Sequence, residues 1–327
     1  MAHKAPGQHY RKGISLLQLT KMFPNEEVAE QWFIQQRWPS GVTCVRCESK
    51  NIQVRKTRKP QPYRCRDCRK DFSVKTDTLM HNSKLTLQQW AFAMYQMSTS
   101  LKGTSSMKLH RDLDITQKST WHVGHRIRSM WDMAQEVSGP VEVDETYIGG
   151  KDKNKHAKKK KERGNAYGVK QAVVGMKSRT TNQIAAQPVD PVSAKTLQRF
   201  VTTKTDRTQV YSDTNRGYWG LRKQGYRLDQ VNHSAGEYVR DMAHTNGMES
   251  FWALLKRGYH GTFHKMSVKH LHRYVNEFAG RHNARPMDTI EQLSTMVLGM
   301  EGKRLPYKAL VLEALVLEAL VLDNSTH

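Results

Sequence analysis

Three acidic side chains stand where they could hold divalent metal ions. Asp144 lies in the strand-like run VEVDETYIGG, Asp213 ends the run TQVYSD, and Glu249 lies in HTNGMESFWALLKRG, an apolar-faced helix. Carboxylates held close together repel one another, and a hard cation such as Mg²⁺ or Mn²⁺ relieves that repulsion. Two such cations can stabilise the entering and leaving oxygens of a phosphodiester displacement. Either Asp alone is more simply a turn former at a strand end.

Two further side chains lie on the helix that carries Glu249. Lys256 stands seven positions later, two turns along the same face, so it can meet a phosphate while Glu249 faces a metal. Asn246 stands three positions earlier on that face and is the second choice for the third metal-facing residue. Three neighbours, for which strand solubility or a local hydrogen bond is the favoured interpretation, are Glu142, Glu145 and His244.

All four cysteines lie in one short region as two CxxC pairs separated by 17 residues. They are Cys44, Cys47, Cys65 and Cys68. This spacing can present four thiolates tetrahedrally to one Zn²⁺, and four protein ligands leave no open position for catalysis. Two disulfides are the alternative, which a cytosolic compartment disfavours. The sequence therefore predicts a zinc ribbon with a structural metal.

The elements around the two aspartates follow a recognisable order. Three strand-like runs are followed by a helix capped by Ser193 and then by a fourth run. The four runs cover 141–150, 170–179, 182–190 and 208–213. This is the order of an RNase H-like α/β fold, in which the first and fourth strands lie side by side. On this interpretation Asp144 and Asp213 become neighbours.

Between the ribbon and the strands, the sequence favours helices. Ser105 and Thr116 can each cap a helix, with a short turn between the two, which suggests a helix-turn-helix. Its second helix would offer polar side chains to a major groove. The candidates are Lys118, Thr120, His122 and Arg126. An ordinary helical connector with a solvated basic face is the alternative.

The charge of the chain predicts a polyanionic partner. Lys and Arg number 53 against 30 acids, a formal net charge of +23 over 327 residues, which favours nucleic acid over a merely basic soluble enzyme. The run KDKNKHAKKKKER at 151–163 is expected to be a loop that contacts DNA phosphates, or else an idle solvated loop. The expected phosphate contacts are Lys158, Lys159, Lys160, Lys161 and Arg257. With neither a signal-peptide pattern nor a membrane-span run, we expect a cytoplasmic protein.

Together these motifs resemble a known family. The segments that carry this resemblance are the zinc ribbon, VDETYIGGK, SDTNRGY, HTNGMESFWALLKRG and RYVNEFAGRHNAR. Over roughly residues 25 to 290, the chain is similar to the ISXO-like DDE transposases of bacterial insertion sequences, relatives of the Merlin-type elements. The resemblance implies catalytic acids at Asp144, Asp213 and Glu249, with Lys256 beside them. It also implies a homo-oligomer on double-stranded DNA, acting on terminal inverted repeats and target DNA at the bacterial nucleoid.

The sequence thus predicts a multi-domain α+β protein with five segments. They are an N-terminal extension (1–24), a zinc ribbon (25–80), a helix-turn-helix-like region (81–137), an RNase H-like catalytic domain with a mixed five-stranded sheet (138–290) and a tail with an LVLEA repeat (291–327). The expected function is metal-dependent cleavage at element ends and strand transfer. The alternatives are a catalytically inactive DNA-binding regulator and a nuclease or resolvase that does not join strands. The tail matches no helical period and has no assigned role.

Overall fold

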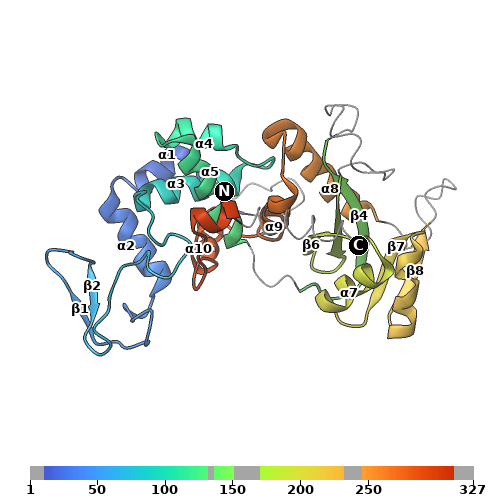
Figure 1. The fold of residues 1–327 in the computed structure, drawn as a ribbon, viewed down its shortest axis with the longest axis horizontal. Coiled ribbons are helices and arrows are strands. Elements are labelled where there is room, and N and C mark those ends of the chain that lie inside the picture. The colour runs from blue at the N-terminus through green and yellow to red at the C-terminus, as the bar shows by residue number, and fades with distance from the viewer. Residues whose placement is uncertain (1–10, 132–135, 151–169, 232–244, 313–327) are drawn as a thin grey trace. The chain divides into compact units, whose positions relative to one another are not determined.

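The computed structural model describes residues 11–131, 136–150, 170–231 and 245–312. The chain divides into two compact units (Figure 1). The first comprises Met1–Ser100, Thr104–Trp131 and Ala284–His327, and the second comprises Leu101–Gly103 and Asp132–Asn283. Within the described ranges, no helix combines the length and the apolar composition that crossing a membrane requires.

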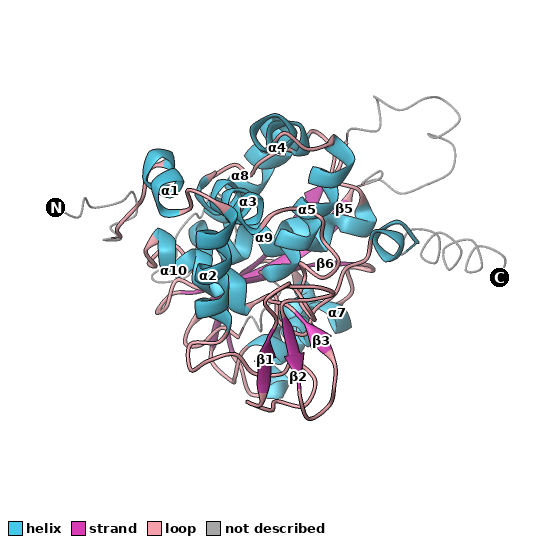
Figure 2. Ribbon diagram, turned by 90° about the vertical axis from the view of Figure 1, so that its left-hand side faces the viewer, coloured by secondary structure: helices cyan, strands magenta, loops and turns pink. Residues whose placement is uncertain are grey.

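The predicted ribbon is a small antiparallel sheet in the first unit (Figure 2). Its strands are β1 (Ile52–Val54), β2 (Tyr63–Cys65) and β3 (Asp71–Phe72). The Tyr63 and Phe72 rings pair across β2 and β3, with ring centroids 5.5 Å apart, and Trp38 packs edge-on against both at 6.0 Å. This aromatic group is the ribbon's main apolar support, because its strands are too short to bury a core of their own.

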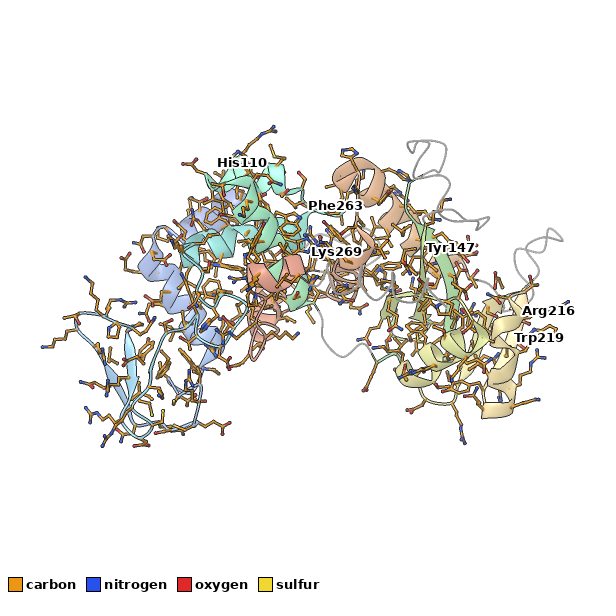
Figure 3. The ribbon with its side chains drawn as sticks, in the orientation of Figure 1. His110, Tyr147, Arg216, Trp219, Phe263 and Lys269 are labelled. Atoms are coloured by element: carbon orange, nitrogen blue, oxygen red, sulfur yellow. The ribbon has the colours of Figure 1, made fainter. Side chains whose placement is uncertain are left out.

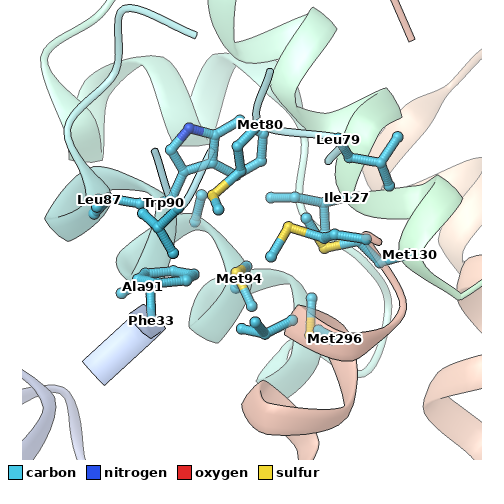
Figure 4. Packing of buried hydrophobic residues seen from close by; sticks show 14 of the residues in the cluster. Phe33, Leu79, Met80, Leu87, Trp90, Ala91, Met94, Ile127, Met130 and Met296 are labelled. Atoms are coloured by element: carbon cyan, nitrogen blue, oxygen red, sulfur yellow. The ribbon is translucent and has the colours of Figure 1, made fainter. Parts of the chain in front are cut away.

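The rest of the first unit is helical. Its helices are α1 (Leu16–Met22), α2 (Glu26–Arg37), α3 (Leu87–Thr99), α4 (Ser106–Leu113), α5 (Gln117–Met130) and α10 (Thr289–Leu298). Phe33, Trp90, Met94, Ile127 and Met296 bring side chains from four of them into one buried cluster (Figure 4). The apolar face of α10 is therefore part of this core, and residues 284–312 belong to the first unit. The sequence analysis had assigned residues 284–290 to the catalytic domain and the following residues to a tail.

Helices α4 and α5 form the predicted pair of capped helices. The Ser105 hydroxyl accepts a hydrogen bond from Lys108 N at 3.2 Å, and the Thr116 hydroxyl accepts one from Ser119 N at 3.3 Å. Asp114, with φ of 51°, ends α4 in the left-handed region and turns the chain toward α5. Local signals in the sequence were sufficient here, because a cap satisfies backbone donors within its own first turn.

The second unit is built on a mixed five-stranded sheet with strand order β6-β5-β4-β7-β8. The strands are β4 (Val141–Ile148), β5 (Gln171–Ser178), β6 (Ile184–Val189), β7 (Gln209–Asp213) and β8 (Arg227–Val231). Strand β5 pairs antiparallel with both β4 and β6, whereas β7 pairs in parallel with both β4 and β8. The predicted fold class is confirmed, because the first and fourth strands are adjacent as the RNase H-like order requires.

Helices cover both faces of this sheet. On one face, α7 (Ala194–Lys204), capped by Ser193, and the 3₁₀ helix η2 (Arg216–Gln224) pack on the buried valines of β4. On the other face, α8 (Asn246–Gly258) and α9 (Leu271–Asn283) pack on the apolar side chains of β5 and β6. Successive residues of β4 therefore point to opposite faces of the sheet, and helices cover both faces. Polar side chains on β4 need hydrogen-bond partners for this reason.

Gly175 of β5 allows α8 to approach the sheet closely. A Cβ atom at this position would lie 2.5 Å from the Met248 side chain and 2.7 Å from the Trp252 ring. Gly175 is also the ladder partner of Asp144, and the Trp252 indole N–H donates to Asp144 Oδ2 at 3.0 Å. The missing side chain thus makes room for the ring that orients Asp144.

Replacing Gly175 with alanine is expected to lower the free energy of unfolding by about 1–3 kcal/mol, because the added methyl group must displace α8. Urea unfolding measures this change. Gly150→Ala is the matched control, since no heavy atom lies within 4 Å of a Cβ atom there. Equal stability of the two variants would contradict the packing described above.

Candidate active site

The sheet register brings the two predicted aspartates together. In the parallel pair, Val141 is aligned with Val210 and Glu142 with Tyr211, and the same offset aligns Asp144 with Asp213. One carboxylate oxygen each from Asp144, Glu145 and Asp213 lie within 4.8 Å of one another. Three negative groups so close together form a site suited to a divalent cation.

Asp144 is held by the helix that covers it. Burial raises the pKa of Asp144 to about 6, and the neighbouring negative charges of Asp213 and Glu249 act in the same direction. The hydrogen bond from the Trp252 indole opposes this shift and fixes the carboxylate. The Asp144 side chain is therefore already oriented before a ligand binds. None of these three neighbours supplies a positive charge to its ionised form.

Glu145 is the third member of the carboxylate group. The buried Tyr218 hydroxyl donates to Glu145 Oε1, and Asn215 Nδ2 donates to both carboxylate oxygens at 3.4 Å. Burial raises the pKa of Glu145 to about 7, and the charges of Asp213 and Asp144 add to the increase. The sequence analysis favoured a solubility or local hydrogen-bonding role for this residue. The sequence around Glu145 does not indicate these two donors, because Tyr218 lies on η2 and Asn215 is the residue that caps η2.

Glu249 and Lys256 lie on the side of α8 that carries Trp252. Glu249 precedes Trp252 by three positions and Lys256 follows it by four, so both are its neighbours on the helix surface. Both side chains are exposed. Glu249 is not in the group of three carboxylates, although its charge contributes to the raised pKa of Asp144. Asn246 is the exposed first residue of α8.

Glu142 anchors α8 to the sheet from the same strand. Its buried carboxylate accepts hydrogen bonds from Gly247 N at 2.8 Å and Met248 N at 3.3 Å, the first turn of the helix. Arg179 makes an ion pair with the same carboxylate at 3.0 Å. A negative charge at a helix N-terminus satisfies its exposed N–H groups and its dipole. Glu142 is thus a positioning residue, and His244 lies outside the described residues.

The raised carboxylate pKa values predict how stability depends on pH. Folded Glu145 keeps its proton up to about pH 7, whereas the ordinary pKa is 4.5. Without added divalent cations, stability should therefore fall as pH rises between these values. At pH 8, Glu145→Gln is expected to have a free energy of unfolding on the order of 1–3 kcal/mol higher than the wild type, measured by urea unfolding. At pH 5 the difference should be much smaller. Exposed Glu136→Gln is the control. A gain that does not change with pH would contradict this explanation.

The four cysteines form a second cluster, in the first unit. Their sulfur atoms all lie within 4.8 Å of one another, and all four are free thiols. The Sγ distances are 3.5 Å for Cys44 to Cys68 and 3.6 Å for Cys47 to Cys65, much longer than a disulfide bond. The Cys68 backbone N–H, donating to Cys65 Sγ, is the main cause that lowers the Cys65 pKa to about 7. A group of four sulfurs is the donor set of a structural zinc site.

The predicted DNA-reading side chains of α5 are engaged within the first unit instead. Thr120 is fully buried, and its hydroxyl donates to Ser106 O at 2.9 Å and to Gln117 O at 2.8 Å. His122 Nε2 and Arg126 Nε both lie within hydrogen-bonding distance of Leu305 O, at 2.8 and 3.1 Å. In this structure these three side chains do not form an open reading face. The physical reason is that residues 305–310 pack against α5 from a distant part of the chain.

The remaining predicted DNA contacts divide into two groups. Lys118 is exposed on α5, with its Nζ atom 4.7 Å from the centre of the Tyr307 ring, and Arg257 is exposed on α8. The run of Lys158, Lys159, Lys160 and Lys161 lies outside the described residues.

Two protein-family models match the segments that contain the two clusters. Residues 136–283 match the family model of the ISXO2-like transposase domain, and residues 24–71 match that of the transposase zinc-ribbon domain. Over 255 residues the chain is 29% identical to an uncharacterised protein in transposable element ISH50 of Halobacterium salinarum. This alignment covers 72% of this chain and 84% of that protein.

Two solved structures also match. One is a pre-cleavage Mos1 transpososome, with 10% identity and coverage of 62% of this chain and 76% of that chain. The other is a Mos1 transposase paired-end complex with left transposon end, with 11% identity and coverage of 66% of this chain and 80% of that chain. Both have a TM-score of 0.25, too low to support a structural argument. The two family models, however, cover the cysteine cluster and the carboxylate cluster in the predicted order. The chain is therefore similar to the ISXO2-like transposases over residues 136–283, and the segment that matches a transposase zinc ribbon precedes this domain.

Proposed function

We propose that this protein is a transposase that cuts DNA at the ends of its own insertion sequence and joins those ends to target DNA. The observation that carries the proposal is the group of carboxylate oxygens from Asp144, Glu145 and Asp213 within 4.8 Å. All the donors of the group are carboxylate oxygens, which suits Mg²⁺ or Mn²⁺. When bound, two such cations would stabilise the charge on the entering and leaving oxygens of a phosphodiester displacement.

In the proposed mechanism, Asp144 and Asp213 would hold the divalent cations together with Glu249 from α8, and the cations would stabilise the charge that develops on the phosphate oxygens. Trp252 keeps the Asp144 carboxylate in place through its indole N–H, and Glu142 keeps α8 in place through the first turn. Lys256, on the same side of α8 as Glu249, meets a phosphate of the bound strand.

Glu249 is favoured over Asn246 as the third metal-facing residue. Its charge affects the Asp144 carboxylate, and it lies three positions from Trp252, whose ring contacts Asp144 directly. Asn246 lies six positions from Trp252, about 120° around the helix axis. A Glu249→Gln variant is expected to lose cleavage activity much more severely than Asn246→Ala does.

The proposed chemistry consists of two displacements with the same geometry. In the first, water attacks the phosphorus at the element end, a P–O bond breaks, and a 3′-hydroxyl is released. In the second, that hydroxyl attacks a phosphodiester of the target strand, loses its proton, and displaces a new 3′-hydroxyl. The number of phosphodiester bonds is unchanged in the second step, so joining needs no added energy source.

Other parts of the chain would bind and assemble the DNA. We propose that Cys44, Cys47, Cys65 and Cys68 hold one structural Zn²⁺, and that the ribbon contacts the terminal inverted repeats. The net charge of +23 supports binding to DNA phosphates, with Lys118, Arg257 and the run Lys158–Lys161 as contacts. Handling two ends and one target favours a homo-oligomer on DNA, acting at the nucleoid in the cytoplasm.

A gel assay with labelled element ends and Mg²⁺ tests the proposed function. The expected result is both nicked ends and products joined to a target plasmid. Nicked ends without joined products would support a nuclease or resolvase. Binding without any cut product would support an inactive regulator, and either outcome would overturn strand transfer. Asp213→Asn protein serves as the control for contaminating nuclease.

A further inference from the structure

One aromatic side chain next to the carboxylate site is exposed. All seven tryptophans of the chain are described, and Trp219 is the only one classed as exposed, at 49% of its surface. It lies on η2, six positions after Asp213 (Figure 3). A single exposed ring is ordinary by itself, so what points to a ligand is how this ring is held and the charge beside it.

The Trp219 ring is tied to the backbone that carries Asp213. Its indole N–H donates to Gln230 Oε1 at 2.7 Å, and Gln230 Nε2 donates to Asp213 O at 2.7 Å and to Asn215 O at 3.1 Å. A single glutamine therefore links the ring to the turn at the end of β7. A ring held in this way loses little conformational freedom when a ligand stacks on it.

Arg216 adds a positive charge to the same surface. Its guanidinium carbon lies 5.3 Å from the centre of the Trp219 ring, and the side chain is exposed (Figure 3). Arg216 and Trp219 are three positions apart on one short helix, so they share a face. An aromatic plane beside a guanidinium group matches a nucleotide, which has an aromatic base and an anionic phosphate.

We propose that Trp219 and Arg216 form a stacking platform for an unpaired nucleobase of the DNA strand presented to Asp144 and Asp213. The inference rests on the proposed function, because it needs DNA at the carboxylate site. Stacking is tolerant of base identity, since every base has an aromatic face. The platform would keep the strand near the scissile phosphate open, while Arg216 contacts the adjacent phosphate.

Binding measurements without added Mg²⁺ or Mn²⁺ test the platform separately from catalysis. The probes are a blunt element-end duplex, the same duplex with a three-nucleotide single-stranded extension, and that extended duplex with abasic sites in the extension. Trp219→Ala is expected to weaken binding of the extended duplex by about 5- to 100-fold, and to change binding of the other two probes by less than about twofold. Trp219→Phe is expected to retain most of the affinity because it keeps an aromatic face.

Several results would overturn the platform. One is an equal loss of affinity for all three probes in Trp219→Ala, which would indicate a structural role. Another is an unchanged affinity for every probe. Val268→Ala is the matched control, since Val268 is an exposed apolar residue of the same unit. Failure of the wild-type protein to bind any element-end probe would instead count against the proposed function, so the two failures are distinguishable.

A fluorescence measurement keeps the proposal testable if Trp219→Ala fails to fold. Because Trp219 is the only exposed tryptophan, it should dominate quenching of the full-length protein by acrylamide. The extended duplex is expected to protect this fluorescence from acrylamide and the abasic version is not. Gln230→Leu, which leaves the ring without its tie, is expected to bind the extended duplex more weakly than the wild type does. Equal protection by the two duplexes would contradict stacking.

Discussion

Replacing Asp213 with asparagine is expected to lower the rates of end cleavage and of joining by at least about 10²–10³-fold. The reason is that the substitution removes one negative charge from the group that would hold the cations, while changing almost nothing in shape. The same assay with labelled ends measures both rates. Asp144→Asn is expected to have an effect at least as large, because Asp144 belongs to the same group and would hold the same cations.

The fold should survive the Asp213 substitution. Asp213 Oδ1 accepts a hydrogen bond from Asn215 N at 3.1 Å, and an asparagine carbonyl oxygen can accept the same bond. Binding of an element-end duplex should therefore remain within about twofold of the wild type. The exposed Asp206→Asn, in the same unit, is the control. Full cleavage activity in Asp213→Asn would show that the carboxylate group is not the catalytic centre.

Removing the metal from the cysteine cluster is expected to unfold the ribbon. The three strands contain only three, three and two residues, too few to be stable by themselves. A structural Zn²⁺ contributes about 10–16 kcal/mol of apparent binding free energy in zinc-finger peptides, far more than this sheet can supply. Cys65→Ser should therefore lose bound zinc, measured by atomic emission, and lose ribbon structure, measured by hydrogen exchange at β1 to β3.

The helices of the first unit should remain folded in that variant, because Trp90, Met94 and Ile127 pack the helices against one another, although Cys44 and Cys65 belong to the same buried cluster. Affinity for element-end DNA is expected to fall along with the loss of zinc. Glu48→Gln, a substitution at an exposed residue beside Cys47, is the control. A Cys65→Ser protein that contains no zinc yet retains protected ribbon amides would rule out a structural metal.

Features with local causes could be predicted from the sequence. The CxxC pairs bring two thiols together within each short turn, and Ser105, Thr116 and Ser193 cap helices within their own first turns. The run VEVDETYI forms a strand because its β-branched residues favour an extended backbone. Once the strands are ordered, the alignment of Asp144 with Asp213 follows from the parallel pairing of β4 and β7.

Features with distant causes could not be predicted. Thr120 and Arg126 are polar and were expected to face DNA, but Arg126 bonds to Leu305, which is 179 positions away. Nothing in the α5 sequence indicates that contact. Similarly, Leu310 of the repetitive tail is fully buried in the first unit although the repeat has no helical period. Glu145 was named as a neighbour of the site, but its hydrogen-bond donors, Asn215 and Tyr218, lie 70 and 73 positions further along the chain.

The central claim is that carboxylates from separate strands hold divalent cations for phosphodiester chemistry. Anomalous diffraction from crystals of the full-length protein soaked in Mn²⁺ tests this claim most directly. We expect manganese peaks about 2.1 Å from the carboxylate oxygens of Asp144 and Asp213, and no such peaks in the Asp213→Asn variant. An intact carboxylate cluster without manganese at millimolar concentration, or manganese bound only elsewhere, would contradict it.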